Sequence, residues 1–111
     1  MYKRPSELLI ADILESIEKI EGYILNISFE DFQKDSKTVD AVVRNLEVIG
    51  EASNRLPEDF KERPSRIEWT KIIGLRNRIV HEYFGVDVDI IWNIIQKELI
   101  KFKKEIKSIR L

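Results

Sequence analysis

Apolar side chains recur every three or four residues along four separate stretches of this chain, and this spacing constrains the fold more than any other feature. An α-helix has 3.6 residues per turn, so residues at such spacings share one face of a helix. Nowhere does the sequence alternate apolar and polar residues as a half-buried strand would. The pattern therefore predicts an all-α protein.

The predicted main helices cover residues 6–26, 36–55, 69–85 and 87–106. Ser28, followed by an acidic turn, is typical of an N-cap and predicts an additional short helix. Ser65 and Glu68 have the spacing of a capping box, so we expect them to begin the third main helix, and Asp87 to cap the fourth. The intervening residues 58–66 predict a loop with one helical turn at most. Together these elements predict an up-and-down bundle of four main helices plus short helical turns.

Gly50 lies in the middle of the second predicted helix, where glycine costs about 1 kcal/mol relative to alanine. We expect it to permit close approach by another helix. Trp69 and Trp92 both fall on apolar stripes, so we expect them to belong to the core rather than to stack on bases.

Composition limits the classes of function. The 111 residues form one predicted domain, residues 1–111, and 43% of them are hydrophobic, which supports a packed core. Nineteen basic residues against 20 acidic ones argue against a polycation, so nucleic acid could bind only at a local patch. The chain has no cysteine, which excludes disulfides, zinc–thiolate sites and thiol catalysis. It shows no signal peptide and no membrane-spanning apolar run, so we expect a cytoplasmic protein without a membrane role.

The segment 74–85, Gly-Leu-Arg-Asn-Arg-Ile-Val-His-Glu-Tyr-Phe-Gly, combines an apolar helical pattern with unusual charge. It contains His81, the only histidine of the chain, together with Arg76, Arg78 and Tyr83. Unpaired charges are expensive to bury, so a buried helix face normally lacks them. Their concentration here makes this segment the expected functional site.

These residue types suit phosphate chemistry. Arg76 can present a fork of donors to phosphate oxygens, and Asn77 and Arg78, four and three residues before His81, lie on its side of the helix as supporting groups. With no cysteine or carboxylate cluster to build a metal site and no sign of a cofactor, the pattern favours metal-independent catalysis. His81 would move a proton while arginine stabilises developing charge. RNA fits best because its 2′-hydroxyl is a built-in nucleophile.

Helical geometry raises a difficulty for a site within one subunit. At about 100° per residue, Arg76 and His81 lie roughly 140° apart around a regular helix, whereas Arg76 and Tyr83 nearly eclipse. Arg76 could curl around the helix, the helix could be distorted, or a second subunit could complete the site. We favour a two-fold homodimer with these helices near its axis.

Each of these residues also has an ordinary structural explanation. A lone histidine such as His81 is more often structural than catalytic. Arg76 could pair with Glu47 or Glu51 of the second helix, and Tyr83 could serve as a core or interface aromatic. Three polar residues of the second helix could line the cleft or form a plain polar face: Arg44, Asn45 and Glu47. The lysines near the C-terminus are interrupted by glutamates, which favours a solvated face.

The pattern Arg76-x-x-x-x-His81-x-Tyr83 resembles the motif of the HEPN superfamily, and its flanks resemble the HepT-like branch. Three blocks carry this similarity: residues 41–52, 69–78 and 81–87. The resemblance covers nearly the whole chain.

The resemblance implies a homodimeric, metal-independent endoribonuclease that is the toxin of a type II or type VII toxin–antitoxin pair. Arg76 and His81 would be its catalytic pair, with Asn77 as a supporting polar group. An MntA-like nucleotidyltransferase antitoxin would neutralise it by transferring AMP onto Tyr83. From the residues alone, two other functions stay open: a non-catalytic nucleotide- or substrate-binding partner subunit of a nucleotidyltransferase, and a plain dimeric scaffold.

Overall fold

The computed structural model describes residues 4–84 and 87–109, and the side chains of all of these except residues 80–84. The described residues contain helices and no strand, which confirms the predicted all-α class. The elements are α1 (Ser6–Tyr23), α2 (Phe29–Lys34), α3 (Ser36–Arg55), α4 (Glu58–Lys61), α5 (Trp69–Ile73), α6 (Leu75–Phe84), α7 (Val88–Asn93), the π-helical segment η1 (Ile94–Glu98) and α8 (Leu99–Lys107).

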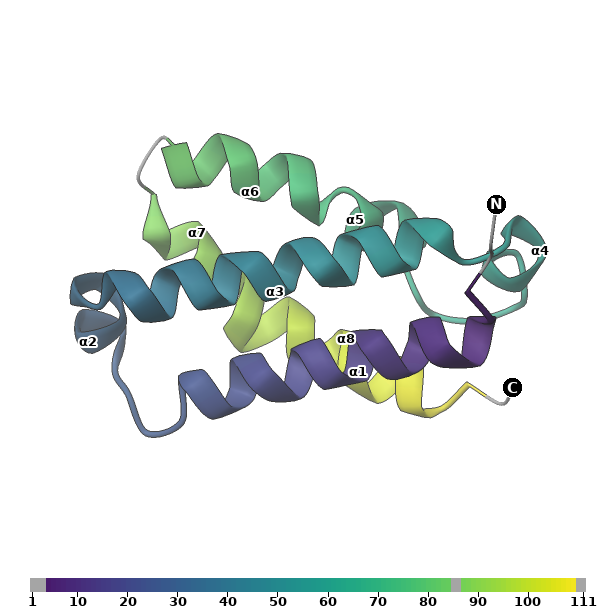
Figure 1. Cartoon of the computed structure of the whole chain (residues 1–111), viewed down its shortest axis with the longest axis horizontal. Coiled ribbons are helices and arrows are strands. Elements are labelled where there is room, and N and C mark those ends of the chain that lie inside the picture. The colour runs from purple at the N-terminus through teal and green to yellow at the C-terminus, as the bar shows by residue number, and fades with distance from the viewer. Residues whose placement is uncertain (1–3, 85–86, 110–111) are drawn as a thin grey trace.

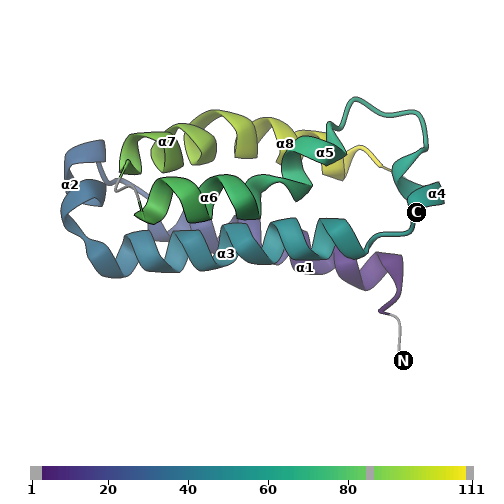
Figure 2. The same cartoon turned by 90° about the horizontal axis from the view of Figure 1, so that it is seen from above.

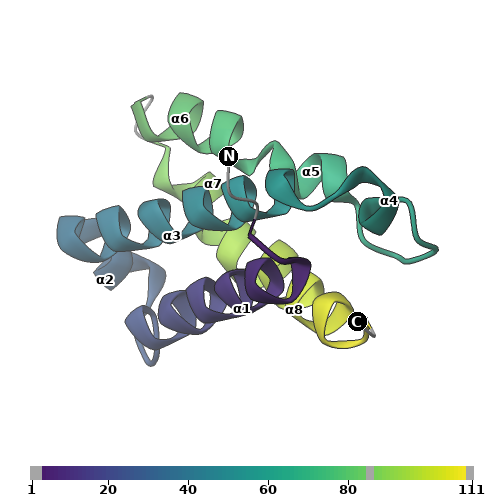
Figure 3. The same cartoon turned by 45° about the vertical axis from the view of Figure 1, so that its right-hand side comes forward.

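Four long helical segments run alternately in opposite directions: α1, α3, α5 with α6, and α7 through α8 (Figure 1). The most extensive contact joins α1 and α3. Helix α6 lies between α3 and the α7–α8 segment (Figure 2), and α8 returns beside α1 (Figure 3). This order closes a four-helix bundle and agrees with the predicted up-and-down arrangement.

The core between these segments consists of buried aliphatic and aromatic side chains from every main helix. The most completely buried include Ile13, Ile20, Phe32, Leu46, Ile49, Leu75, Ile79, Ile91, Phe102 and Ile106. Trp69 is buried and meets the rings of Phe60 and Phe102 edge-on, at centroid distances of 6.3 and 5.9 Å. Trp92 is half-buried and packs on Phe32 at 5.1 Å. The prediction that both tryptophans belong to the core is confirmed.

The turn between α1 and α2 explains one boundary that sequence reading misplaced. Helix α1 was expected to reach Asn26 but ends at Tyr23. Asn26 has φ of 62°, a left-handed conformation that asparagine tolerates better than most residues and that cannot continue a right-handed helix. Ser28 then caps α2 as predicted, because its hydroxyl accepts the Asp31 backbone N–H at 3.1 Å.

Helix α3 has the predicted bounds, and Asp35 caps its start. The Asp35 carboxylate accepts hydrogen bonds from the Thr38 hydroxyl at 2.6 Å and the Thr38 backbone N–H at 3.2 Å. The side-chain hydrogen bond from Thr38, followed by the backbone one, holds the pKa of Asp35 below its usual value. Helix α3 ends at Arg55, and Leu56 continues in an extended conformation.

The third main helix is divided, contrary to the single helix predicted from Trp69 onward. Helix α5 ends at Ile73, Gly74 forms a turn, and α6 begins at Leu75. A Cβ atom on Gly74 would lie 3.2 Å from the Thr70 carbonyl oxygen, so the backbone is crowded at this turn. The predicted capping box is wrong: the Ser65 hydroxyl accepts the Ile67 backbone N–H at 3.3 Å, and the helix begins only at Trp69, after Ile67 has been buried in the core.

The junction of α5 and α6 rests on Gly50 of α3. A Cβ atom there would lie 3.5 Å from the carbonyl oxygens of Ile72 and Ile73 and 3.6 Å from the backbone nitrogen of Arg76. Two helix backbones therefore approach closely at this glycine, as the sequence predicted.

The fourth main helix begins where predicted, with Asp87 at the N-cap position of α7, but no capping hydrogen bond from the Asp87 side chain occurs within the described residues. A π-helical segment, η1, interrupts this helix and was not predicted.

Candidate functional site

Helix α6 carries the motif, and its backbone is helical from Leu75 to Phe84. The distortion of the third main helix lies at Gly74, before Arg76, so no break separates Arg76 from His81 in the backbone. The side chains of His81 and Tyr83 lie outside the described residues. Of the site residues predicted on α6, the structure therefore describes the side chains of Arg76, Asn77 and Arg78.

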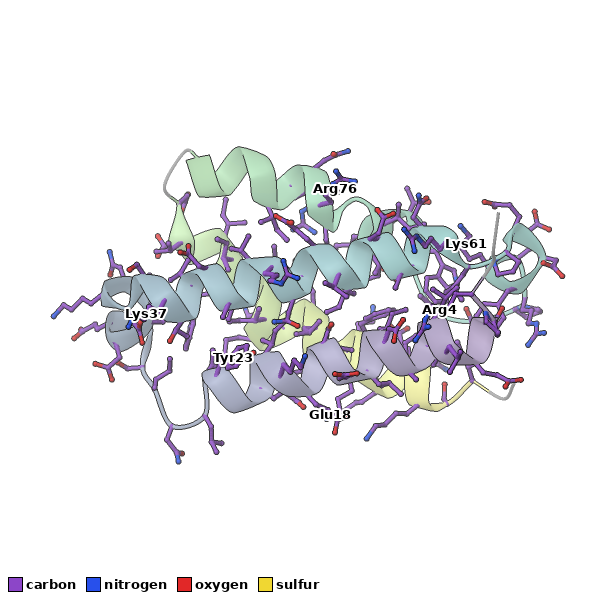
Figure 4. The ribbon with its side chains drawn as sticks, in the orientation of Figure 1. Arg4, Glu18, Tyr23, Lys37, Lys61 and Arg76 are labelled. Carbon is purple, nitrogen blue, oxygen red and sulfur yellow. The ribbon has the colours of Figure 1, made fainter. Side chains whose placement is uncertain are left out.

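Arg76 lies near the start of α6, on the side facing α3 (Figure 4). Its side chain is 64% exposed, and its Nη1 atom lies 3.4 Å from the Glu51 carboxylate of α3. The pairing with Glu51 is the structural alternative that the sequence left open. An exposed pair at this distance contributes about 0–1 kcal/mol, so it leaves the guanidinium available to a stronger anionic partner.

Glu51 also contacts a second arginine. Its other carboxylate oxygen lies 3.4 Å from the Nε atom of Arg55, one turn further along α3. The Glu51 carboxylate thus lies between the guanidinium groups of Arg55 and Arg76. All three side chains are exposed by 43% or more, so solvent and solutes reach them.

These side chains line a groove of about 500 Å³ formed by α1, α3 and the start of α6. Four of the lining residues are arginines and three are acids, which leaves a formal charge of +1 on the lining: Arg4, Arg44, Arg55, Arg76, Asp12, Glu47 and Glu51. At the α1 end, Arg4 pairs with Asp12 through two hydrogen bonds of 2.7 and 3.0 Å. Leu9, Val48 and Ala52 supply apolar contacts.

The polar residues of α3 proposed for a cleft do line grooves. Arg44 and Glu47 border the groove beside Arg76, and Arg44 and Asn45 border a neighbouring one of about 280 Å³ between α1 and α3. Asn45 is buried and donates its amide to the Ala41 carbonyl at 2.9 Å, so its role there is structural. Arg44 is exposed and makes no hydrogen bond or ion pair with any other described side chain.

Arg78 lies elsewhere, although sequence reasoning grouped it with Arg76. Its guanidinium donates two hydrogen bonds of 3.1 Å to the carboxylate of Glu98 in η1, and Lys71 reaches the same carboxylate at 3.3 Å. Hydrogen bonding from Arg78 holds the pKa of Glu98 below its usual value, against the opposing effect of burial. Arg78 thus ties α6 to the fourth main helix and does not line the groove of Arg76.

Asn77 is exposed on α6 and lines neither groove. Sequence reasoning missed Arg55, Arg4 and Asp12 as groove residues. The helical spacing of α3 could have indicated Arg55, because residues 44, 47, 51 and 55 follow steps of three and four along one face. Nothing in the sequence places the start of α1 against that face.

Two features are absent from the described residues. These residues contain no group of three or more acidic or histidine side chains arranged to hold a metal ion. Among them no helix has both the length and the apolar character to cross a membrane.

Comparison with known proteins identifies the family. The model of the family described as "Ribonuclease HepT-like" matches residues 13–109. The "Probable ribonuclease HepT" of Thermococcus cleftensis is 41% identical over 108 residues, which cover 97% of this chain and 98% of that protein. A "Putative RNase" of Caldanaerobacter subterraneus subsp. tengcongensis is 45% identical over 97 residues, or 87% of each chain. No solved structure matches the chain. The chain therefore belongs to the HepT-like ribonuclease family.

Proposed function

We propose that this protein is a metal-independent endoribonuclease and the toxin of a toxin–antitoxin pair, with Arg76 and His81 as its catalytic residues. The observation that carries the proposal is the exposed Arg76 guanidinium beside an open groove, on the helix that holds the family motif. Similarity to proteins named as ribonucleases supports RNA as the substrate.

In the proposed reaction, the RNA 2′-hydroxyl loses its proton and attacks the adjacent phosphorus. A 2′-oxygen–phosphorus bond forms, the bond to the 5′-oxygen breaks, and that oxygen leaves with a proton. His81 transfers protons in one or both of these steps. Arg76 stabilises the negative charge that accumulates on the phosphoryl oxygens in between.

The weak contact of Arg76 with Glu51 is compatible with this role. A guanidinium buried in a tight ion pair would have to break that pair before it could bind phosphate. Arg76 is instead 64% exposed, with its carboxylate partner at 3.4 Å, and exposed pairs of this kind exchange partners at little cost.

We further propose that two subunits complete the site. Because α6 is an unbroken helix from Leu75 to Phe84, positions 76 and 81 lie about 140° apart around its axis. A homodimer that places two α6 helices near a two-fold axis would bring Arg76 of one protomer toward His81 of the other. Sedimentation velocity tests this arrangement, and an active stable monomer would refute it.

Neutralisation is proposed to occur at Tyr83. AMP units attached there by an MntA-like nucleotidyltransferase would add phosphodiester anions on the same face of the helix as Arg76, two turns further along. These anions would compete with the RNA phosphate for Arg76. After incubation with the cognate transferase and ATP, the intact mass should rise in AMP steps. An unchanged mass, or a rise that persists in Tyr83→Phe, would contradict this proposal.

The catalytic proposal is tested by RNA cleavage in EDTA. Wild type should cleave, and Arg76→Ala and His81→Ala should each lower kcat by at least about a hundredfold. Arg66→Ala is the matched control, because Arg66 is also exposed but lies in the segment between α4 and α5. Equal cleavage by all four proteins would refute the assignment of Arg76 and His81, whereas no cleavage by wild type would favour a non-catalytic partner subunit of a nucleotidyltransferase.

A further inference from the structure

The Glu51 carboxylate marks a position where two arginines can bind an anion together. One carboxylate lies between two guanidinium groups, with each of its oxygens 3.4 Å from a different arginine. Arginine binds planar and tetrahedral oxyanions with the same donor fork, so a position that accepts a carboxylate between two arginines also suits a phosphate.

We propose that Arg55 is a second RNA phosphate-binding residue beside Arg76, and that Glu51 is a resident counter-ion which the RNA displaces. This inference rests on the proposed ribonuclease function, because it extends the substrate contacts of that same site. RNA would then lie along the groove formed by α1, α3 and the start of α6, with one phosphate at Arg76 and a neighbouring one at Arg55.

Exposure and distance favour displacement of Glu51. The Arg55 side chain is 63% exposed and that of Glu51 is 43% exposed, so neither is held by burial. Both contacts of Glu51 are longer than the 2.7–2.9 Å of strong charge-assisted hydrogen bonds. Neighbouring phosphodiester groups of an RNA strand are not tethered to α3, so each can approach its own guanidinium group more closely than the Glu51 carboxylate does.

The groove has room and a net positive lining for part of a single RNA strand. Its volume of about 500 Å³ exceeds the space of one phosphate, and it is lined by one more basic than acidic residue. Once RNA displaces Glu51, the Glu51 carboxylate no longer neutralises the positive charges of Arg55 and Arg76. Arg44, on the same face of α3, continues the basic lining toward the neighbouring groove.

Binding is tested with a short, fluorescein-labelled 2′-O-methyl RNA, which lacks the free hydroxyl needed for cleavage, so anisotropy reports affinity alone. Arg55→Gln should weaken binding about tenfold. It should also lower the slope of log affinity against log salt by about 0.7, the value for one phosphate contact on a single strand. Arg55→Lys, which keeps the charge, should retain the salt slope. Glu51→Gln should bind more tightly than wild type.

Lys37→Gln is the matched control. It removes one positive charge from the same helix, but Lys37 lies 18 residues from Arg55, or roughly 27 Å along α3, at the opposite end of that helix from α4 (Figure 4). An Arg55→Gln protein with the affinity and salt slope of Lys37→Gln would overturn the inference. So would an Arg55→Gln protein that binds RNA normally but changes its sedimentation, since that result would assign the groove to a second copy of the chain.

The inference and the proposed function fail in different ways. If wild type cleaves unmodified RNA in EDTA and Arg55→Gln binds like the control, only the inference is wrong. If wild type binds the 2′-O-methyl RNA through Arg55 but cleaves nothing, the phosphate contact stands and the catalytic proposal is wrong. Absence of binding by wild type at low salt would overturn both.

Discussion

Replacing Glu98 by glutamine should destabilise the protein by removing the charge that joins α6 to the fourth main helix. The Glu98 side chain is 19% exposed and accepts two hydrogen bonds of 3.1 Å from Arg78, with Lys71 at 3.3 Å. Glutamine keeps the shape of the side chain but has one oxygen and no charge. The variant therefore loses one of the two hydrogen bonds from Arg78 and the charge attraction between the two side chains.

The magnitude follows from the exposure of the three groups. Hydrogen bonds to charged groups contribute about 1.5–3 kcal/mol when protected from water, and exposed pairs about 0–1 kcal/mol. Arg78 is 37% exposed and Lys71 48% exposed, so the Arg78 contact falls between these limits and the Lys71 contact near the lower one. We expect Glu98→Gln to lower the free energy of unfolding by about 1–1.5 kcal/mol at pH 7, or Tm by about 4–6 °C.

The pH dependence of this stability difference tests the role of the Glu98 charge more specifically than its size at pH 7. The folded-state pKa of Glu98 lies below its ordinary value of 4.5. A depressed pKa stabilises the protein above the unfolded-state pKa, and this stabilisation is lost as the pH falls through the folded-state pKa. The stability difference between wild type and Glu98→Gln should therefore be full near pH 7 and shrink below about pH 4.5.

Urea denaturation followed by far-ultraviolet circular dichroism measures this difference. Glu68→Gln is the control, because the Glu68–Lys101 pair is 3.8 Å long and more than 60% exposed on both sides. Arg78→Gln and the double variant complete a mutant cycle. A Glu98→Gln protein as stable as the control, or a stability difference that does not change from pH 7 to about pH 3, would refute the reasoning.

Three further predictions concern packing and capping. Gly50→Ala should keep the stability of the protein or raise it by up to about 1 kcal/mol, because the alanine Cβ would meet backbone atoms at 3.5–3.6 Å, which is ordinary van der Waals contact. Gly50→Leu should instead displace the start of α6. Measurements of Tm and of RNA cleavage check both expectations. Phe102→Ala should lose about 3–5 kcal/mol, because Phe102 is 1% exposed and packs on Trp69, and urea midpoints measure the loss. Ser28→Ala should cost about 1 kcal/mol by removing the cap of α2, measured by the same unfolding curves with Ser65→Ala as control.

Helix positions and the core were largely predictable because they depend on local periodicity and capping. The limits of α3, the cap at Ser28 and the buried positions of Ile13, Leu46 and Phe102 all follow from residues that are neighbours in the chain. The errors arose where tertiary contacts override local preference. The start at Trp69 was predicted correctly, but the break at Gly74 was not, and it occurs where α5 and α6 must each pack on α3.

The candidate site was only partly predictable for the same reason. Residue spacing along the chain was enough to assign Arg76 to a charged motif on a helix and to recognise the resemblance to HepT-like proteins. The tertiary structure alone decided that Arg78 points to Glu98 and that Arg76 meets Glu51 beside Arg55. These partners lie 20–25 residues apart in the chain, and helical spacing cannot say which faces of two helices meet. The packing of the bundle determines which helix faces meet.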